Sequence, residues 1–171
     1  STTILEELGI VSDELAVRTN ADGSASWISF DSQEFQSGSY FRSADGFHGN
    51  LSEYYGGVIQ WDVLGALGTL NVERKPDLIL VSGSLVVGLE IDNEPKPGSW
   101  TSYRASIDSS SEWMVLSDDG SIPLDLSSSD FALATDEQLK AVLSDLRDLF
   151  IRGDYVNGDN KVGIDNVLIS P

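Results

Sequence analysis

The sequence has no cysteine and a single histidine, and each shortage removes a class of function. Without cysteine, the 171-residue chain can form no disulfide, no thiol nucleophile and no thiolate zinc site. His48 alone cannot form a histidine-rich metal cluster, and a serine hydrolase would have to use it as its base. No G-x-S-x-G motif accompanies it, so we expect a protein that is not an enzyme.

Basic residues are also scarce, with 10 Lys and Arg against 28 Asp and Glu, a net charge of −18. A surface with this charge repels phosphates and anionic lipids, so we expect no nucleic-acid partner. No apolar run approaches the roughly 20 residues that span a bilayer, and we expect no membrane insertion. Because such acidity suits salty or calcium-rich surroundings, we expect a secreted or cell-surface module, monomeric in isolation.

What the sequence does have is short apolar segments separated by glycine and serine. In residues 57–63 (G-V-I-Q-W-D-V), Ile59, Trp61 and Val63 share one face of a strand, which predicts a buried Trp61. Trp113 shares a face with Val115 and is predicted to be buried as well. Residues 77–91 are largely apolar on both sides of a turn at 82–84, as expected of a central hairpin.

These segments predict an all-β fold, an antiparallel β-sandwich with one short amphipathic helix. Thr135 and Gln138 form a capping box, and apolar residues recur at helical spacing through residue 146, so the helix is predicted to end near Asp148. We assign residues 26–171 to the sandwich. Residues 1–25 are either an N-terminal extension or the first strand or helix of the same domain.

Four blocks of sequence resemble, in the same order, the laminin IV type A domain, also called the laminin B domain. They are residues 40–57 (from Y-F-R-S-A to Y-Y-G-G), 76–80 (P-D-L-I-L), 130–131 (D-F) with the following helix, and 151–155 (I-R-G-D-Y) with 164–167 (I-D-N-V). The resemblance implies a jelly-roll sandwich similar to galactose-binding-like modules, extracellular and non-catalytic. The strong acidity departs from an animal matrix domain and favours a microbial protein whose module binds glycan.

The candidate ligand-binding residues are Trp100 and Arg104, with Tyr54 and Tyr55. Trp100 and Arg104 share the polar face of a strand over residues 100–108. An indole ring offers a platform for the C–H face of a sugar, and a guanidinium donates hydrogen bonds to hydroxyls. Tyr54 and Tyr55, in a glycine-flanked loop, would extend this platform.

A structural role is the alternative for the same residues. Trp100 could fill a corner beneath the loop at 95–98, and Arg104 could pair with Glu90 or Asp92. We therefore keep two functional hypotheses. The first is a module that binds polysaccharide or glycan on a sheet face, and the second is an adhesive or architectural module that contacts an extracellular protein. Exposed rings on a groove would favour the first, and a flat apolar patch the second.

Calcium is the expected cofactor, in a structural role, with Asp31 and Asp165 as its candidate ligands. Asp31 follows an apolar strand, Asp165 lies in the closing strand, and calcium takes six to eight oxygen ligands. The resemblance implies such a site, because related jelly-roll modules often hold one ion where the first and last strands meet. The alternative is that carboxylates lie near one another by chance in so acidic a chain.

Overall fold

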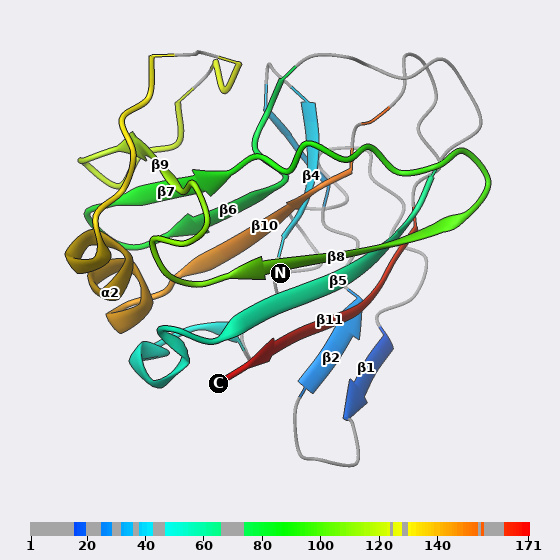
Figure 1. Cartoon of the computed structure of the whole chain (residues 1–171), viewed down its shortest axis with the longest axis horizontal. Helices are drawn as coiled ribbons and strands as arrows, with labels where there is room; N and C mark the ends of the chain where they lie inside the picture. The colour runs from blue at the N-terminus through cyan, green and yellow to red at the C-terminus, as the bar shows by residue number, and fades with distance from the viewer. Residues whose placement is uncertain are drawn as a thin grey trace, which may run out of the picture.

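The computed structural model of the chain (Figure 1) describes residues 16–19, 25–28, 32–35, 38–42, 47–65, 74–123, 125–127, 130–153, 155 and 163–171. Its strands form antiparallel sheets in two facing layers, and a helix lies between late strands of the chain. The predicted antiparallel β-sandwich with an α-helix is confirmed.

The larger layer is a six-stranded sheet with its most apolar strands in the middle. Its strands, in spatial order, are β3 (Ser32–Phe35), β4 (Gly38–Arg42), β10 (Asp148–Arg152), β6 (Leu78–Val81), β7 (Val86–Leu89) and β9 (Met114–Ser117). β6 and β7 are buried throughout and pair from Val81 opposite Val86, which confirms the predicted hairpin. Such continuous burial is expected where both faces of a sheet are covered.

The second layer is a three-stranded sheet in the order β11 (Gly163–Ser170), β5 (Val58–Leu64) and β8 (Trp100–Ser106). Two paired strands, β1 (Ala16–Thr19) and β2 (Ala25–Ile28), extend this layer, with β2 beside β11 (Figure 1). Along β5, buried and half-buried residues alternate, as in a strand with one face toward a core.

The main core lies between the two layers and includes the aromatic residues predicted to be buried. Trp61 and Trp113 are each 1% exposed, which confirms both predictions, and the Trp61 ring stacks on Tyr103 with 5.4 Å between centroids. Each such ring buries about 150–250 Å², which stabilises the fold by about 4–6 kcal/mol. The apolar residues opposite them on the six-stranded sheet are Leu78, Leu80, Val87, Leu89, Leu149 and Ile151.

The helix α2 (Asp136–Ser144) closes one end of the core. The predicted capping box is present, because the Thr135 side chain accepts from the Gln138 backbone and the Gln138 side chain accepts from the Thr135 backbone. The helix ends before the predicted Asp148, since Leu146 leaves it to exchange backbone hydrogen bonds with Gly49. Among the residues described, no helix is long and apolar enough to cross a membrane.

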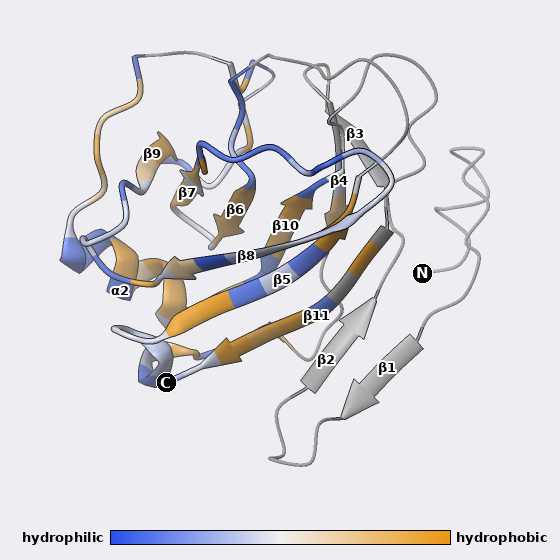
Figure 2. Ribbon diagram, turned by 45° about the vertical axis from the view of Figure 1, so that its right-hand side comes forward, coloured by the Kyte–Doolittle hydropathy of each residue, from blue (hydrophilic) through white to orange (hydrophobic). Residues whose placement is uncertain are grey.

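The outer faces of the two layers differ. A second apolar cluster covers the outer face of the six-stranded sheet, where Ile122, Leu126 and Phe131 from the segment after β9 pack over Ile79 and its neighbours. No described element covers the outer face of β5 and β8, whose middle portions are hydrophilic (Figure 2). The exposed sheet face is therefore that of β11, β5 and β8.

Candidate functional site

An open hollow of about 460 Å³ lies on this exposed sheet face. Because side chains alternate along a strand, the residues between the core positions of β5 and β8 must point outward and form its wall. The hollow is lined by Gln60, Asp62, Ser102, Arg104, Asn166 and Leu168, with Trp61 and Tyr103 at its floor.

The register of β5 and β8 orders the outward residues into rungs. Arg104 lies opposite Gln60, and Ser102 lies opposite Asp62. Trp100 lies opposite Leu64 and forms the next rung beyond the hollow. An arginine, an amide, a hydroxyl and a carboxylate therefore lie side by side, with an indole two residues further along β8.

A β-bulge in β11 completes the middle rung. The pairing of β11 with β5 shifts between Asp165 and Leu168, and Asn166 within this shift has φ of 53°. A bulge redirects a side chain, and here Asn166 Nδ2 donates to Asp62 Oδ2 at 2.6 Å. Non-glycine residues with positive φ persist where their surroundings hold them, often at functional sites. The amide–carboxylate pair is thus built into the sheet.

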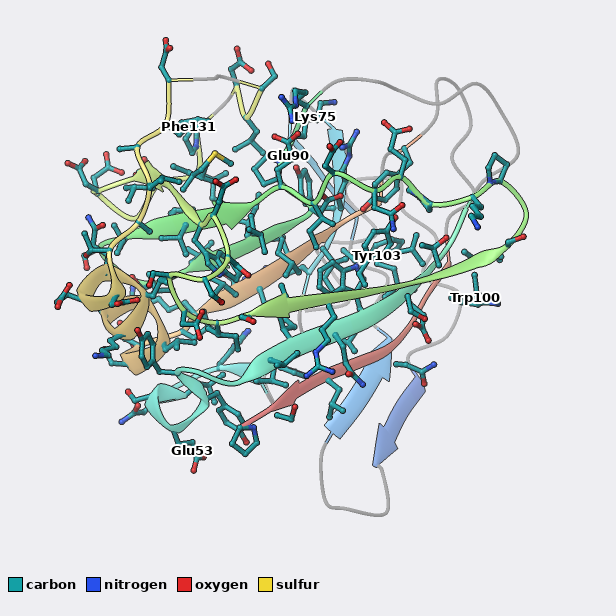
Figure 3. All side chains as sticks on the ribbon, viewed as in Figure 1. Glu53, Lys75, Glu90, Trp100, Tyr103 and Phe131 are labelled. Atoms are coloured by element: carbon teal, nitrogen blue, oxygen red, sulfur yellow. The ribbon has the colours of Figure 1, made fainter. Side chains whose placement is uncertain are left out.

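Two of the predicted ligand-binding residues, Trp100 and Arg104, lie on this face. Trp100 is 52% exposed and points away from the core, whereas Tyr103 of the same strand points between the layers (Figure 3). Arg104 is also exposed. The alternative partner Glu90 instead binds Arg74, with 2.8 Å between Nε and Oε1. β8 pairs with β5 rather than with the strand that precedes Glu90, so Arg104 faces Gln60.

The structure does not bring Tyr54 and Tyr55 to this face. They lie at and just after the 3-10 helix η2 (Ser52–Tyr54), next to α2, and pack against the core. The Tyr55 hydroxyl bonds to Asp136, which raises the pKa of Tyr55 to about 12, and Lys140 Nζ lies 4.5 Å from its ring centroid. Glu53 of η2 and Trp100 are at opposite ends of the molecule (Figure 3), so the tyrosines do not extend the Trp100 platform.

The predicted calcium site stays a prediction. Asp31 lies outside the described residues, as does the side chain of Asp165, whose backbone pairs with Asp62 in β11. Within the described part of the chain, no group of three or more acidic or histidine side chains is placed to hold a metal ion.

A buried polar cluster, not predicted from the sequence, lies between the layers. Asp77 is 2% exposed and accepts from the Ile91 backbone N–H at 2.6 Å and from the Tyr155 hydroxyl at 2.8 Å. Burial raises the pKa of Asp77 to about 6, although these two bonds and the positive charge of Arg152 act to lower it. Because the cluster is enclosed by the core, its role is to join strand ends rather than to meet a ligand.

Sequence reasoning did not single out the other polar residues that line the hollow: Gln60, Asp62, Ser102 and Asn166. The alternation in residues 57–63 already places Gln60 and Asp62 on the face opposite Trp61. What was missing was the pairing of β5 with β8, which brings them beside Ser102 and Arg104. Asn166 could not be assigned, because no local signal marks the bulge.

The sequence model of the family described as Laminin B (Domain IV) matches residues 40–170. The chain belongs to the laminin B family. Its fold is similar to that of the L4b domain of human laminin alpha-2, with a TM-score of 0.63 and 17% identity over 77% of this chain and 69% of that one. No curated protein matches it in a sequence comparison.

A second solved structure, an exo-beta-agarase, is 17% identical and covers 94% of this laminin B chain and 23% of its own. Its TM-score of 0.38 is too low to support any argument. Laminin B domains are structural modules of extracellular matrix proteins rather than enzymes, which agrees in outline with the non-catalytic, extracellular module expected from the sequence.

Proposed function

We propose that this laminin B chain is a non-catalytic recognition module of a secreted or cell-surface protein, and that it binds carbohydrate in the hollow on β5, β8 and β11. The observation that carries the proposal is the half-exposed Trp100 ring next to a hollow lined by hydrogen-bonding side chains. A concave surface with an aromatic ring and a few placed polar groups is the usual form of a small-ligand site.

The lining matches the chemistry of a sugar. Each hydroxyl of a sugar both donates and accepts hydrogen bonds. Arg104 offers N–H donors, Asp62 offers acceptor oxygens, and Gln60, Asn166 and Ser102 offer both. The flat indole of Trp100 suits the apolar C–H face of a sugar ring.

We expect modest affinity. The hollow is open to solvent. When a sugar binds there, its hydroxyls lose hydrogen bonds to water and form hydrogen bonds to the protein, so the net gain in binding free energy is small. Ordering a flexible ligand costs further free energy, and a single stacked ring contributes only a few kcal/mol. We therefore expect a high dissociation constant for the complex with a sugar, as for other weakly binding modules.

Contact with an extracellular protein is the second candidate, and the architectural role of the family favours it. Such a contact would use a contiguous apolar patch. The large apolar side chains exposed in the described part of the chain are Trp100 and Leu133. They belong to different layers, since Leu133 is bridged to β9, so they do not form a patch. Carbohydrate remains the better occupant.

A glycan array with the wild type, Trp100→Ala and Leu133→Ala tests the proposal. Both substitutions remove a large exposed apolar side chain, but only Trp100 adjoins the hollow. The proposal expects a glycan bound by the wild type and by Leu133→Ala and lost or weakened with Trp100→Ala. Equal binding by all three proteins, or no glycan bound by the wild type, would contradict it.

A further inference from the structure

The hollow and the adjoining Trp100 together form a surface that is longer along β8 than across the sheet. Outward residues of one strand are about 7 Å apart, and the three strands β8, β5 and β11 span about 10 Å across the sheet. The three rungs from Arg104 through Ser102 to Trp100 therefore extend over about 14 Å of β8, with Gln60 and Asp62 beside them on β5. A surface of this shape suits several consecutive sugar units better than one terminal sugar.

The middle rung has a fixed acceptor. Asp62 Oδ2 accepts from Asn166 Nδ2 at 2.6 Å, and the bulge of β11 holds the amide in place. A carboxylate has about four lone-pair positions, so Asp62 can accept further hydrogen bonds from ligand hydroxyls. Because Asn166 already orients the carboxylate, little side-chain entropy is lost when a ligand binds.

The negative charge of the protein limits which class of polysaccharide can reach Asp62. The lining carries one cation, Arg104, and one carboxylate, Asp62, while the whole chain has a net charge of −18. An acidic polysaccharide would approach against the field of the entire molecule, with a carboxylate in the middle of its path. An uncharged chain meets neither obstacle.

We infer that the hollow binds an uncharged, linear polysaccharide laid along β5 and β8, with Asp62, held by Asn166, as the specificity-determining acceptor for its hydroxyls. This inference rests on the proposed carbohydrate function and narrows it to a class of ligand. Arg104 and Gln60 bind one end of the occupied stretch, and Trp100 stacks on a ring at the other end.

Affinity electrophoresis at physiological ionic strength tests the ligand class. The probes are uncharged xyloglucan, glucomannan and mixed-linkage β-glucan, and acidic alginate, polygalacturonate and hyaluronan. We expect retardation by an uncharged chain and none by the acidic ones. Retardation by an acidic chain as strong as by any uncharged one would overturn the inference and leave the proposed function standing. Retardation by neither class would also overturn the inference, and binding or no binding on the glycan array would then decide whether the proposed function stands.

The role of Asp62 is tested with Asp62→Asn and a matched control, Glu53→Gln. Each replaces a carboxylate by an amide and removes one negative charge, but Glu53 lies on η2, away from the hollow (Figure 3). We expect Asp62→Asn to weaken binding of the retarded uncharged chain about tenfold, as for loss of a hydrogen bond to a charged group, and Glu53→Gln to leave it unchanged. Equal binding by the two variants would remove Asp62 from the site.

The orientation of the bound polysaccharide along the strands is tested with oligosaccharides of increasing length from the same polysaccharide. Calorimetric titration measures the affinity of each oligosaccharide. In the wild type, affinity should increase with each added unit until the chain reaches from Arg104 to Trp100. In Trp100→Ala this increase should stop earlier, while the shortest oligosaccharide binds as in the wild type. If Trp100→Ala weakens all lengths by the same factor, or if one sugar unit binds as well as a long chain, the chain is not laid along the strands.

Discussion

The buried carboxyl of Asp77 should make the stability of the fold depend on pH, and Asp77→Asn is the substitution that isolates it. Asn can keep both contacts, because its oxygen can accept from the Ile91 N–H while its NH₂ donates to the Tyr155 hydroxyl, which then acts as acceptor. The variant thus imitates the protonated acid and keeps the shape of the site.

The magnitude follows from the displaced pKa. Asp77 has a pKa of about 6 in the folded chain against 3.8 as its ordinary value. A raised folded-state pKa means that the folded chain holds the proton more tightly than the unfolded chain, and each tenfold difference in proton affinity is worth about 1.4 kcal/mol. As pH falls from 7 through 6 to 4, the wild type should therefore gain about 2.4 kcal/mol of unfolding free energy from this group, and the full value of about 3 kcal/mol only below the unfolded pKa of 3.8. Asp77→Asn should gain none of it.

Urea denaturation of both proteins at pH 4, 5, 6 and 7 measures the effect. Exposed carboxyls with a lowered pKa, such as Asp119 at about 2, lose stabilising interactions as pH falls, but they do so equally in both proteins and cancel in the difference. The difference in unfolding free energy, variant minus wild type, should be about 2.4 kcal/mol larger at pH 7 than at pH 4. A difference that stays constant with pH, or one that resembles the exposed control Asp118→Asn, would refute the reasoning.

Further predictions concern the helix cap, a packed glycine and calcium. Thr135→Ala should lower the unfolding free energy by about 1 kcal/mol and Thr135→Ser should restore most of it, as measured by urea denaturation, because the cap accepts the Gln138 N–H. Gly88→Ala should lower the unfolding free energy measured in the same way by about 1–3 kcal/mol, because a Cβ there would lie 2.8 Å from Leu116 Cδ1. An unchanged unfolding free energy would show that the sheet relaxes around the added methyl group. If calcium binds the folded chain, millimolar calcium should raise the melting temperature above that in chelator, and equal melting temperatures would remove the predicted site.

The strand around Trp61 and the start of the helix were predictable because each depends on the residues of one short stretch of sequence. The alternation in residues 57–63 placed Trp61 in the core, and the capping box placed the start of α2. The end of α2 was misplaced, because the apolar spacing continues to Leu146, which is buried by its bridge to Gly49 rather than by the helix. Spacing alone does not distinguish these two forms of burial.

The site was only partly predictable because it depends on pairing between distant segments. Trp100 and Arg104 were found from their phase on one strand, which is local information. Their neighbours are set by the antiparallel pairing of β8 with β5, some 40 residues apart in the sequence, and by the bulge at Asn166. The burial of Asp77 was missed for the same reason, since its partner Tyr155 is distant in sequence.

The alternation of β5 and β8 separates what holds this domain together from what it can recognise. Inward positions such as Trp61 and Tyr103 are committed to the core, whereas the intervening positions on the hollow carry little of the folding free energy. Related chains can therefore exchange the outward residues, and change their ligand, without having to evolve a new scaffold.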